Sequence, residues 1–157
     1  VLLETFMIAW FFLLTRKPQV ISLMRREVHD NHERKVLLDE AEAATIGLRL
    51  DRLSADGIFR RPDLDLGRLA GRIQVPAYRL SRYFNEKLAT SFPVWLNRSR
   101  VNWVCARMAE VPGTSLLDLA REAGYSSKTT FNTQFVRVKG MSPTEFRKVS
   151  ATREVSP

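Results

Sequence analysis

The sequence has a single cysteine, Cys105, and only two histidines among its 157 residues. One cysteine excludes an internal disulfide, and three Cys or His side chains cannot supply the four ligands of a structural zinc site. The run Ser126-Ser127-Lys128 resembles an SxxK motif but lacks the other elements of a serine hydrolase. We therefore expect neither an enzyme, nor a bound metal ion, nor a cofactor.

Long hydrophobic runs are scarce as well, and the one at residues 1–14 is short for a membrane span. Fourteen helical residues extend about 21 Å, whereas the hydrocarbon core of a bilayer measures about 30 Å. Three interpretations stay open: the end of a transmembrane helix that starts upstream, which we favour; a buried or partner-binding helix; and an interfacial anchor. A signal peptide fits less well, because Arg16 and Lys17 follow the apolar run instead of preceding it.

Acidic side chains are few in the C-terminal part of the chain. Residues 57–157 contain 17 basic and 8 acidic side chains, whereas residues 1–56 contain 8 basic and 9 acidic ones. An excess of positive charge confined to one region indicates an acidic partner for that region, and nucleic acid is the commonest such partner. We therefore look for the binding surface beyond residue 57.

Apolar residues recur at helical spacing through most of the chain, and strand-like alternation is not evident. We predict an all-α fold with two helix-turn-helix subdomains joined by a long linker helix. The predicted order is an apolar helix at 1–15, a polar linker at 16–39, a folded domain at 40–150 and a flexible tail at 151–157. Within the domain, the first helix-turn-helix spans about 64–88, the linker helix about 93–110 and the second helix-turn-helix about 115–139.

Glycine, proline and serine mark where the predicted helices begin and end. Pro76 suits the first turn of a helix, because that turn needs no intrahelical N–H donor. Gly124 is expected in the left-handed conformation that ends a helix, and Ser126 is expected to cap the helix that follows. Ser142 and Glu145 have the spacing of a capping box before a short closing helix.

The C-terminal half resembles the DNA-binding domain of the AraC/XylS family of bacterial transcription regulators, over roughly residues 63–148. The motif VPAYRLSRYFNE, a linker helix and SLLDLAREAGYSSKTTFNTQFVRVKGMSPTEFRK carry the resemblance. The second half matches the family signature position by position, from Ala120 through Gly124-Tyr125-Ser126-Ser127 to Phe146-Arg147. The resemblance implies that two recognition helices, at 77–85 and 127–138, enter successive major grooves of duplex DNA.

The resemblance also assigns residues to the interface. Base-facing positions are Tyr78, Ser81 and Arg82 in the first helix and Lys128, Thr129, Asn132 and Thr133 in the second. Candidate contacts to the DNA backbone are Arg79, Asn85, Arg98, Arg100, Ser127, Arg137 and Lys139. Two departures from the family pattern stand out: Pro76 replaces a usual serine cap, and Thr133 replaces a frequent arginine.

The function expected from these observations is a sequence-specific DNA-binding transcription regulator. Its expected partners are double-stranded DNA and RNA polymerase, and no small-molecule site is visible in the sequence. By resemblance to membrane-tethered members, the domain would act in the bacterial cytoplasm, with an anchor to the inner membrane through residues 1–14. The alternative is a helical protein-interaction module that retains the fold without reading bases.

Overall fold

The computed structural model describes residues 38–154, with side chains as far as Ser150. The predicted apolar helix at 1–15 and nearly all of the predicted polar linker at 16–39 therefore lie outside the described residues. Within residues 38–154, no helix combines the length and the apolar character that crossing a membrane requires.

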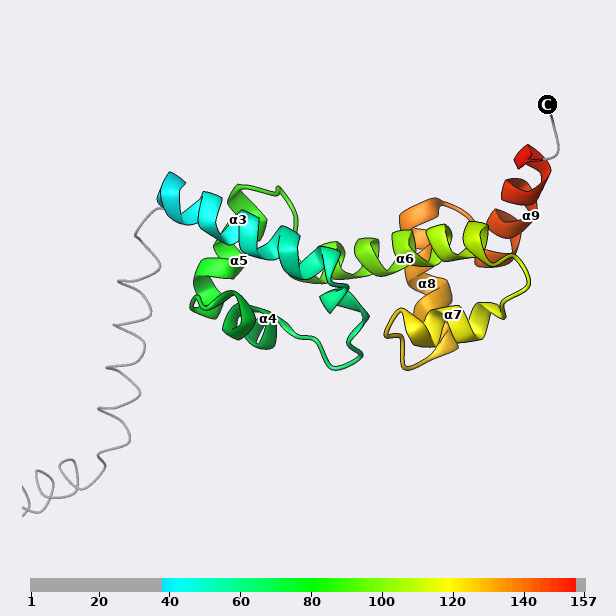
Figure 1. The fold of residues 1–157 in the computed structure, drawn as a ribbon, viewed down its shortest axis with the longest axis horizontal. Helices are drawn as coiled ribbons and strands as arrows, with labels where there is room; N and C mark the ends of the chain where they lie inside the picture. Colours follow the sequence, from blue (N-terminus) through cyan, green and yellow to red (C-terminus); the bar gives the residue numbers. More distant parts are fainter. Residues whose placement is uncertain (1–37, 155–157) are drawn as a thin grey trace, which may run out of the picture. The chain divides into compact units, whose positions relative to one another are not determined.

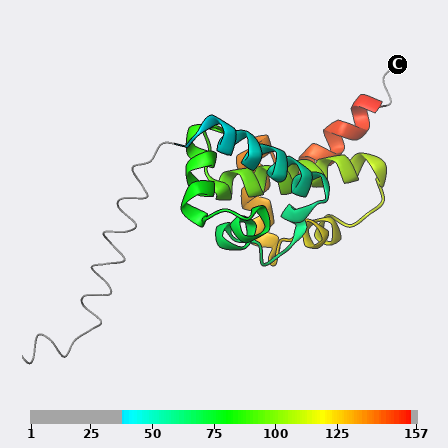
Figure 2. The ribbon, with the colours of Figure 1, turned by 60° about the vertical axis from the view of Figure 1, so that its left-hand side comes forward.

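Every regular element in the described range is helical, as predicted (Figure 1). The elements are α3 (Glu40–Ala55), the short 3₁₀ helix η1 (Ile58–Arg60), α4 (Leu66–Ile73), α5 (Ala77–Glu86), α6 (Phe92–Glu110), α7 (Leu116–Glu122), α8 (Lys128–Lys139) and α9 (Pro143–Glu154). Two views agree that α6 connects the α4–α5 pair to the α7–α8 pair (Figures 1 and 2). The α9 helix continues to Glu154, so it extends into the segment predicted as a flexible tail.

The first helix-turn-helix consists of α4, a tight turn and α5. Asp65 caps α4 by accepting a hydrogen bond from the Arg68 backbone N–H, and Gln74 ends the helix in the left-handed conformation, at φ 63°. A positive φ is costly for a residue with a Cβ atom, so this turn carries strain that a glycine would avoid. Pro76 is the N-cap of α5, and it provides no side-chain cap because its ring has no hydrogen-bonding group.

The second helix-turn-helix repeats this arrangement with α7 and α8. Gly124 takes the left-handed position at φ 91°, as predicted. The backbone N–H of the next residue, Tyr125, donates to Ala120 O, just as Val75 N–H donates to Ala70 O in the first unit. The prediction that Ser126 caps α8 is wrong: the cap is Ser127, whose Oγ accepts from the Thr130 N–H at 3.1 Å.

The long helix α6 contributes to two separate hydrophobic clusters. Its first half places Trp95 and Leu96 against the first unit, and its second half places Val101 and Val104 against the second. Half-buried Trp103 packs against both clusters. The largest fully buried side chains are Ile46, Leu69, Ile73, Leu80, Phe84, Val101, Val104, Leu119, Phe131 and Phe135. Because each helix-turn-helix has a core of its own, α6 is the element that both cores share.

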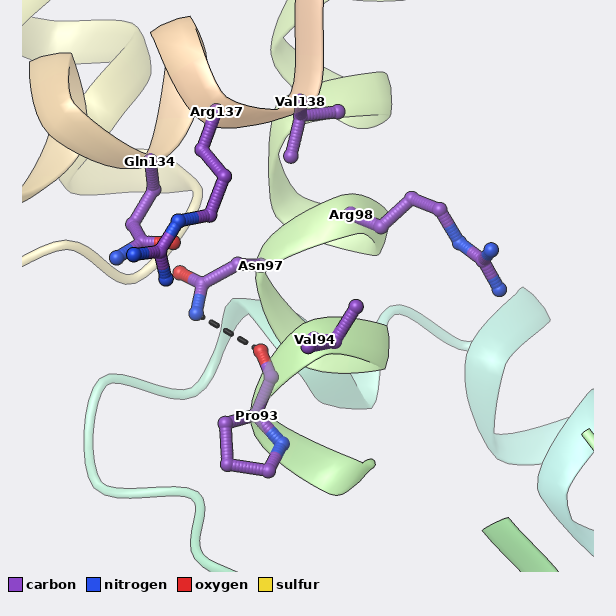
Figure 3. A pocket seen from close by; sticks show the side chains of 7 residues that line it. All are labelled: Pro93, Val94, Asn97, Arg98, Gln134, Arg137 and Val138. Carbon is purple, nitrogen blue, oxygen red and sulfur yellow. Dashed lines mark hydrogen bonds between the residues drawn. The ribbon is translucent and has the colours of Figure 1, made fainter. Parts of the chain in front are cut away.

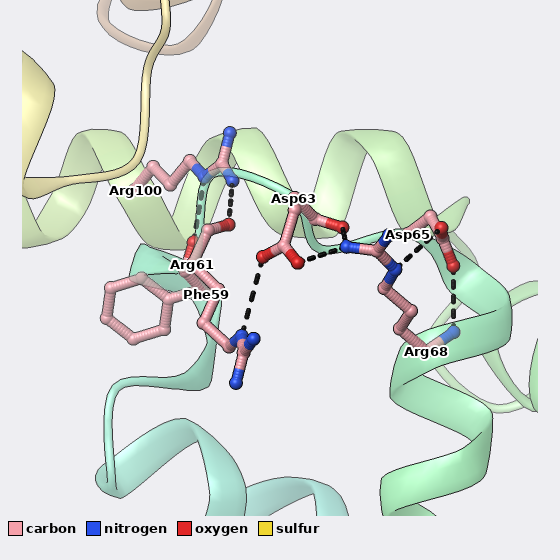
Figure 4. A network of polar contacts seen from close by, with 6 residues as sticks. All are labelled: Phe59, Arg61, Asp63, Asp65, Arg68 and Arg100. Carbon is pink, nitrogen blue, oxygen red and sulfur yellow. Dashed lines mark hydrogen bonds and ion pairs between the residues drawn. The ribbon is translucent and has the colours of Figure 1, made fainter.

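A second connection between the two units passes through Arg100 on α6 (Figure 4). Its Nε donates to Phe59 O at 2.8 Å, and its Nη2 donates to Arg61 O at 2.7 Å. On the side of the second unit, the same guanidinium lies 5.3 Å from the centroid of the Tyr125 ring. Arg100 is only 7% exposed and two of its N–H groups already have carbonyl partners, which argues against the predicted contact with the DNA backbone. Burial also lowers the pKa of this guanidinium below its usual value.

Candidate nucleic-acid interface

The first recognition helix, α5, buries one side and leaves its candidate contact residues on the other. Leu80, Tyr83 and Phe84 are its buried residues. The three predicted base-facing residues, Tyr78, Ser81 and Arg82, are half-buried, and the predicted backbone contact Asn85 is exposed. The structure thus leaves these four predicted side chains with solvent access on one helix, although their contact with DNA stays a prediction.

Arg82 and Arg79 each have an acidic partner. Arg82 Nε lies 2.8 Å from Glu86 Oε1, one turn further along α5. Arg79 Nη1 lies 3.1 Å from Glu42 Oε2 on α3, and the Arg79 guanidinium lies over the Tyr78 ring at 5.6 Å from its centroid. A DNA phosphate or base would therefore compete with a carboxylate for either arginine.

The α3 helix holds the first helix-turn-helix at several points, a role that helical spacing alone did not indicate. Besides the Glu42–Arg79 pair, Glu40 forms an ion pair with Lys87, just past the end of α5. Arg49 Nη1 donates to Ile73 O at 2.7 Å, at the end of α4. The only sequence signal for these contacts was the pair of acidic residues in the first turn of α3. The geometry makes α3 an integral part of the first unit.

The second recognition helix, α8, is anchored by Phe131 and Phe135, which are 1% and 0% exposed. Lys128, Thr129 and Thr133 are exposed and Asn132 is half-buried. Val136 is also exposed, at 46%, and lies one turn beyond Asn132 and Thr133, two of the predicted base-facing residues. Sequence reasoning passed over Val136 because a valine in a helix is ordinarily counted as core.

The residues predicted to contact the DNA backbone differ in their surroundings. Ser127 caps α8, which leaves its Oγ engaged with the Thr130 N–H. Lys139 Nζ donates to Asn102 Oδ1 at 2.9 Å and lies 5.8 Å from the Phe146 ring centroid, so it links α8 to α6 and α9. Arg98 and Arg137 are exposed and remain available for a phosphate.

A shallow pocket of about 320 Å³ lies between the start of α6 and the second half of α8 (Figure 3). Its lining residues are Pro93, Val94, Asn97, Arg98, Gln134, Arg137 and Val138. Gln134 and Arg137 project from α8 towards Asn97, whereas Arg98 extends away from them. The sequence did not reveal this pocket, because its two walls are about forty residues apart along the chain.

The loop before α4 contains a compact network of charges (Figure 4). Asp63 forms ion pairs with Arg61 and Arg68, and the hydrogen bond from Arg61 holds the pKa of the Asp63 carboxyl below its usual value. Arg68 also pairs with Asp65, the cap of α4. Arg61 in the loop and Arg68 in α4 are thus matched by two acids, so this network adds no net positive charge.

Reactive and metal-binding groups do not gather elsewhere in the described part of the chain. Over residues 38–154, no three His, Cys, Asp or Glu side chains are grouped so that they could hold a metal ion. Burial raises the pKa of the Cys105 thiol, which disfavours the thiolate that cysteine chemistry requires.

Residues 69–149, just over half of the chain, match the family model described as "Helix-turn-helix domain". The chain is also 28% identical over 90 residues to the melibiose operon regulatory protein of Escherichia coli K12. That similarity covers 57% of this chain but only 30% of the relative, so the chain spans less than a third of the length of this protein.

Solved structures show the same fold. The C-terminal domain of AraT, a response regulator from Geobacillus stearothermophilus, aligns with a TM-score of 0.60 and 22% identity, covering 73% of this chain and 88% of that one. A DNA-binding transcriptional dual regulator from Escherichia coli K-12 aligns with a TM-score of 0.56 and 24% identity, and the alignment covers 64% of this chain and 90% of that one. The DNA-binding domain of AdpA, solved in complex with a target DNA, aligns with a TM-score of 0.56 and 23% identity. That alignment covers 73% of this chain and 96% of the other. With the family match and the paired helix-turn-helix units, these findings show that the chain belongs to the AraC/XylS family of helix-turn-helix transcription regulators.

Proposed function

We propose that this chain is a sequence-specific DNA-binding transcription regulator that inserts α5 and α8 into two successive major grooves of one duplex. The observation that carries the proposal is the Arg100 junction, which ties η1 and the residue that follows it to the middle of α6 through hydrogen bonds of 2.8 and 2.7 Å. Successive major grooves on one face of B-form DNA lie about 34 Å apart. A constant separation between its two units lets a single monomer read two groove segments without the cost of ordering a flexible linker.

The side chains on α5 fit a guanine-containing site. Arg82 can replace its exposed intrahelical partner, Glu86, with guanine O6 and N7, the contact that arginine most often makes in the major groove. Tyr78 can pack against a thymine methyl group, and Ser81 is short enough to reach either kind of base pair. This assignment predicts that the first groove segment contains a G·C pair opposite Arg82.

The side chains on α8 are shorter and mostly uncharged. Asn132 can bind adenine N6 and N7, while Lys128 can reach guanine from the first turn. The proposed backbone contacts set the position of the domain without carrying sequence information; they are Arg79, Asn85, Arg98, Ser127, Arg137 and Lys139. We do not include Arg100 in this proposal, because its side chain is buried in the junction.

The cellular setting follows from the DNA. A domain of this kind works in the bacterial cytoplasm, where the chromosome is, and RNA polymerase remains its predicted further partner. The proposed membrane anchor through residues 1–14 lies outside the described residues and stays a prediction.

Selection of duplexes from a random pool, followed by titration of the 157-residue chain at several salt concentrations, tests the proposal. Affinity should fall linearly on a log–log plot against salt, because phosphate contacts release counterions. Arg82→Ala should weaken binding to the selected duplex by about 1–3 kcal/mol and leave random duplexes almost unaffected. Arg137→Ala should weaken binding to all duplexes alike, and Arg52→Ala, on α3, is the matched control without an assigned contact.

Two outcomes would contradict the proposal. Equal losses on selected and random duplexes for Arg82→Ala would remove its base-reading role. Failure of the unmodified chain to bind any duplex at low salt would instead favour the alternative, a helical protein-interaction module.

A further inference from the structure

One exposed face of α8 carries side chains at positions i, i+3, i+4 and i+7: Thr129, Asn132, Thr133 and Val136. At 3.6 residues per turn, these positions form a single stripe along the helix. The opposite side of α8 is fixed in the core by Phe131 and Phe135, both almost completely buried. The orientation of the stripe is therefore determined by the core, and the side chains on it point away from the second unit.

Val136 differs from its neighbours in having no polar atom in its side chain. It is 46% exposed, although it belongs to a helix whose apolar residues are otherwise largely buried. A lone exposed valine is common and needs no explanation by itself. The position is informative because Val136 continues the stripe of three residues already proposed to face bases, and because the preceding Thr129 and Thr133 each carry a methyl group.

Three side chains with methyl groups and one amide thus make up the stripe. A valine in a helix is held near one χ1 rotamer, and its two methyl groups end close to the backbone. It cannot reach a phosphate as lysine or arginine would, and it can neither donate nor accept a hydrogen bond. The one feature of a base edge that it can recognise in the major groove is the C5-methyl group of thymine.

We infer that Val136 is a specificity-determining residue that contacts a thymine methyl group in the second groove segment. The inference rests on the proposed function and extends it to a residue for which no role had been assigned. Asn132 lies four residues earlier, about 6 Å along the helix axis, which is a distance of about two base-pair steps. A thymine for Val136 and an adenine for Asn132 give the second segment a preference for A·T pairs, whereas Arg82 favours guanine in the first.

The test uses the selected duplex and replaces single thymines in the second segment by deoxyuridine, which removes only the C5-methyl group. For the unmodified chain, one of these replacements should weaken binding about 4-fold, the equivalent of one buried methyl group. In Val136→Ala the same replacement should have almost no effect, so the two changes are not additive. Val149→Ala is the matched control, because Val149 on α9 is exposed to a similar extent, at 44%.

Each outcome decides between the inference and the proposal on which it rests. Three results would overturn the role of Val136 and leave the proposed function intact. The chain could bind specifically without any sensitivity to deoxyuridine, or Val136→Ala and the unmodified chain could be equally sensitive to it. The third such result is a selected second segment that contains no thymine. Failure to select any duplex would overturn both. Circular dichroism of Val136→Ala should match the unmodified chain, since an exposed side chain contributes little to stability.

Discussion

Gly124 lies directly against the carbonyl group of Arg60. A Cβ atom at Gly124 would come within 2.5 Å of Arg60 O and 3.1 Å of Arg100 Nη2. Gly124 belongs to the turn of the second helix-turn-helix, whereas Arg60 ends η1 in the first part of the domain. The turn that the family signature contains is therefore also part of the contact between the two units, next to the buried guanidinium of Arg100.

Gly124→Ala should be strongly destabilising, for two separable reasons. Its φ of 91° is unfavourable for any residue with a Cβ atom, which costs about 1–2 kcal/mol, and the new methyl group would collide with backbone atoms that cannot rotate away. Gly140→Ala and Gly113→Ala are matched controls. Gly140 has a φ of 74° with open space around it, and Gly113 has open space without a positive φ. Urea unfolding should show the largest loss of unfolding free energy for Gly124→Ala, a smaller loss for Gly140→Ala and the smallest for Gly113→Ala. Equal losses for Gly124→Ala and Gly140→Ala would contradict the close contact.

Arg100→Met and Arg100→Lys should both lower the free energy of unfolding, by about 3 kcal/mol for methionine. Methionine retains the apolar stem but leaves Phe59 O and Arg61 O without their donors, and a lysine ammonium cannot reproduce the planar pair of N–H groups. The unmodified chain should bind a duplex with both groove segments more tightly than a duplex with one, and we expect both variants to lose most of this difference in affinity.

The salt dependence of binding separates this structural role from a phosphate contact. If Arg100 contacted DNA, Arg100→Lys would retain the charge and most of the affinity, while Arg100→Met would lower the slope of the salt plot by about one unit. On a duplex with one groove segment, where coupling of the two units plays no part, a junction residue should leave that slope unchanged in both variants.

Glu42→Gln should loosen α3 from α5 and raise the affinity for DNA. The Glu42–Arg79 pair is partly screened from solvent, so its loss should lower the free energy of unfolding by about 0.5–1 kcal/mol. Removing the carboxylate also removes a competitor of the phosphates for Arg79, so binding should tighten on selected and random duplexes alike. Glu110→Gln, which breaks the Arg107 pair at the far end of α6, is the control. Unchanged affinity in Glu42→Gln would show that Arg79 does not contact the DNA backbone.

The capping box of α9 should make a small part of the stability dependent on pH. Glu145 Oε2 accepts from the Ser142 backbone N–H at 2.8 Å, and this bond lowers the pKa of the Glu145 carboxyl below its usual value of 4.5. A carboxyl group with a lowered pKa in the folded state contributes stability above its unfolded pKa and loses it as the pH falls through the folded pKa. Glu145→Gln should therefore be less stable than the unmodified chain at pH 7, and the difference should shrink as the pH drops below about 4.5.

Thermal unfolding of the two proteins between pH 7 and pH 3 measures this difference. Glu122→Gln, which removes an equal charge from the exposed end of α7 outside the capping box, is the matched control. A difference between Glu145→Gln and the unmodified chain that stays constant over this range would mean that the carboxylate charge is not what stabilises the cap.

Local signals in the sequence were sufficient for the helices and most of their ends. The spacing of Leu80 and Phe84, and of Phe131 and Phe135, predicted which sides of α5 and α8 are buried, because large apolar residues at helical spacing form one side of a helix and that side packs into the core. Gly124 and the Ser142–Glu145 pair were predictable for the same reason: backbone conformation and capping involve residues within a few positions of each other. Ser127 was missed as a cap by a single position, which is the ordinary uncertainty of a helix end.

What only the tertiary structure decided is which charged side chains are available to a partner. Arg98, Arg100 and Arg137 are alike in the sequence, yet the structure buries Arg100 against carbonyl groups about forty residues away and leaves the other two exposed. It likewise pairs Arg79 with Glu42 across two helices and leaves Val136 uncovered on an outer face. The pattern along the chain determined a pair of helix-turn-helix units because periodicity and capping are local. The environment of each arginine depends on which distant segments meet, and no short-range rule contains that information.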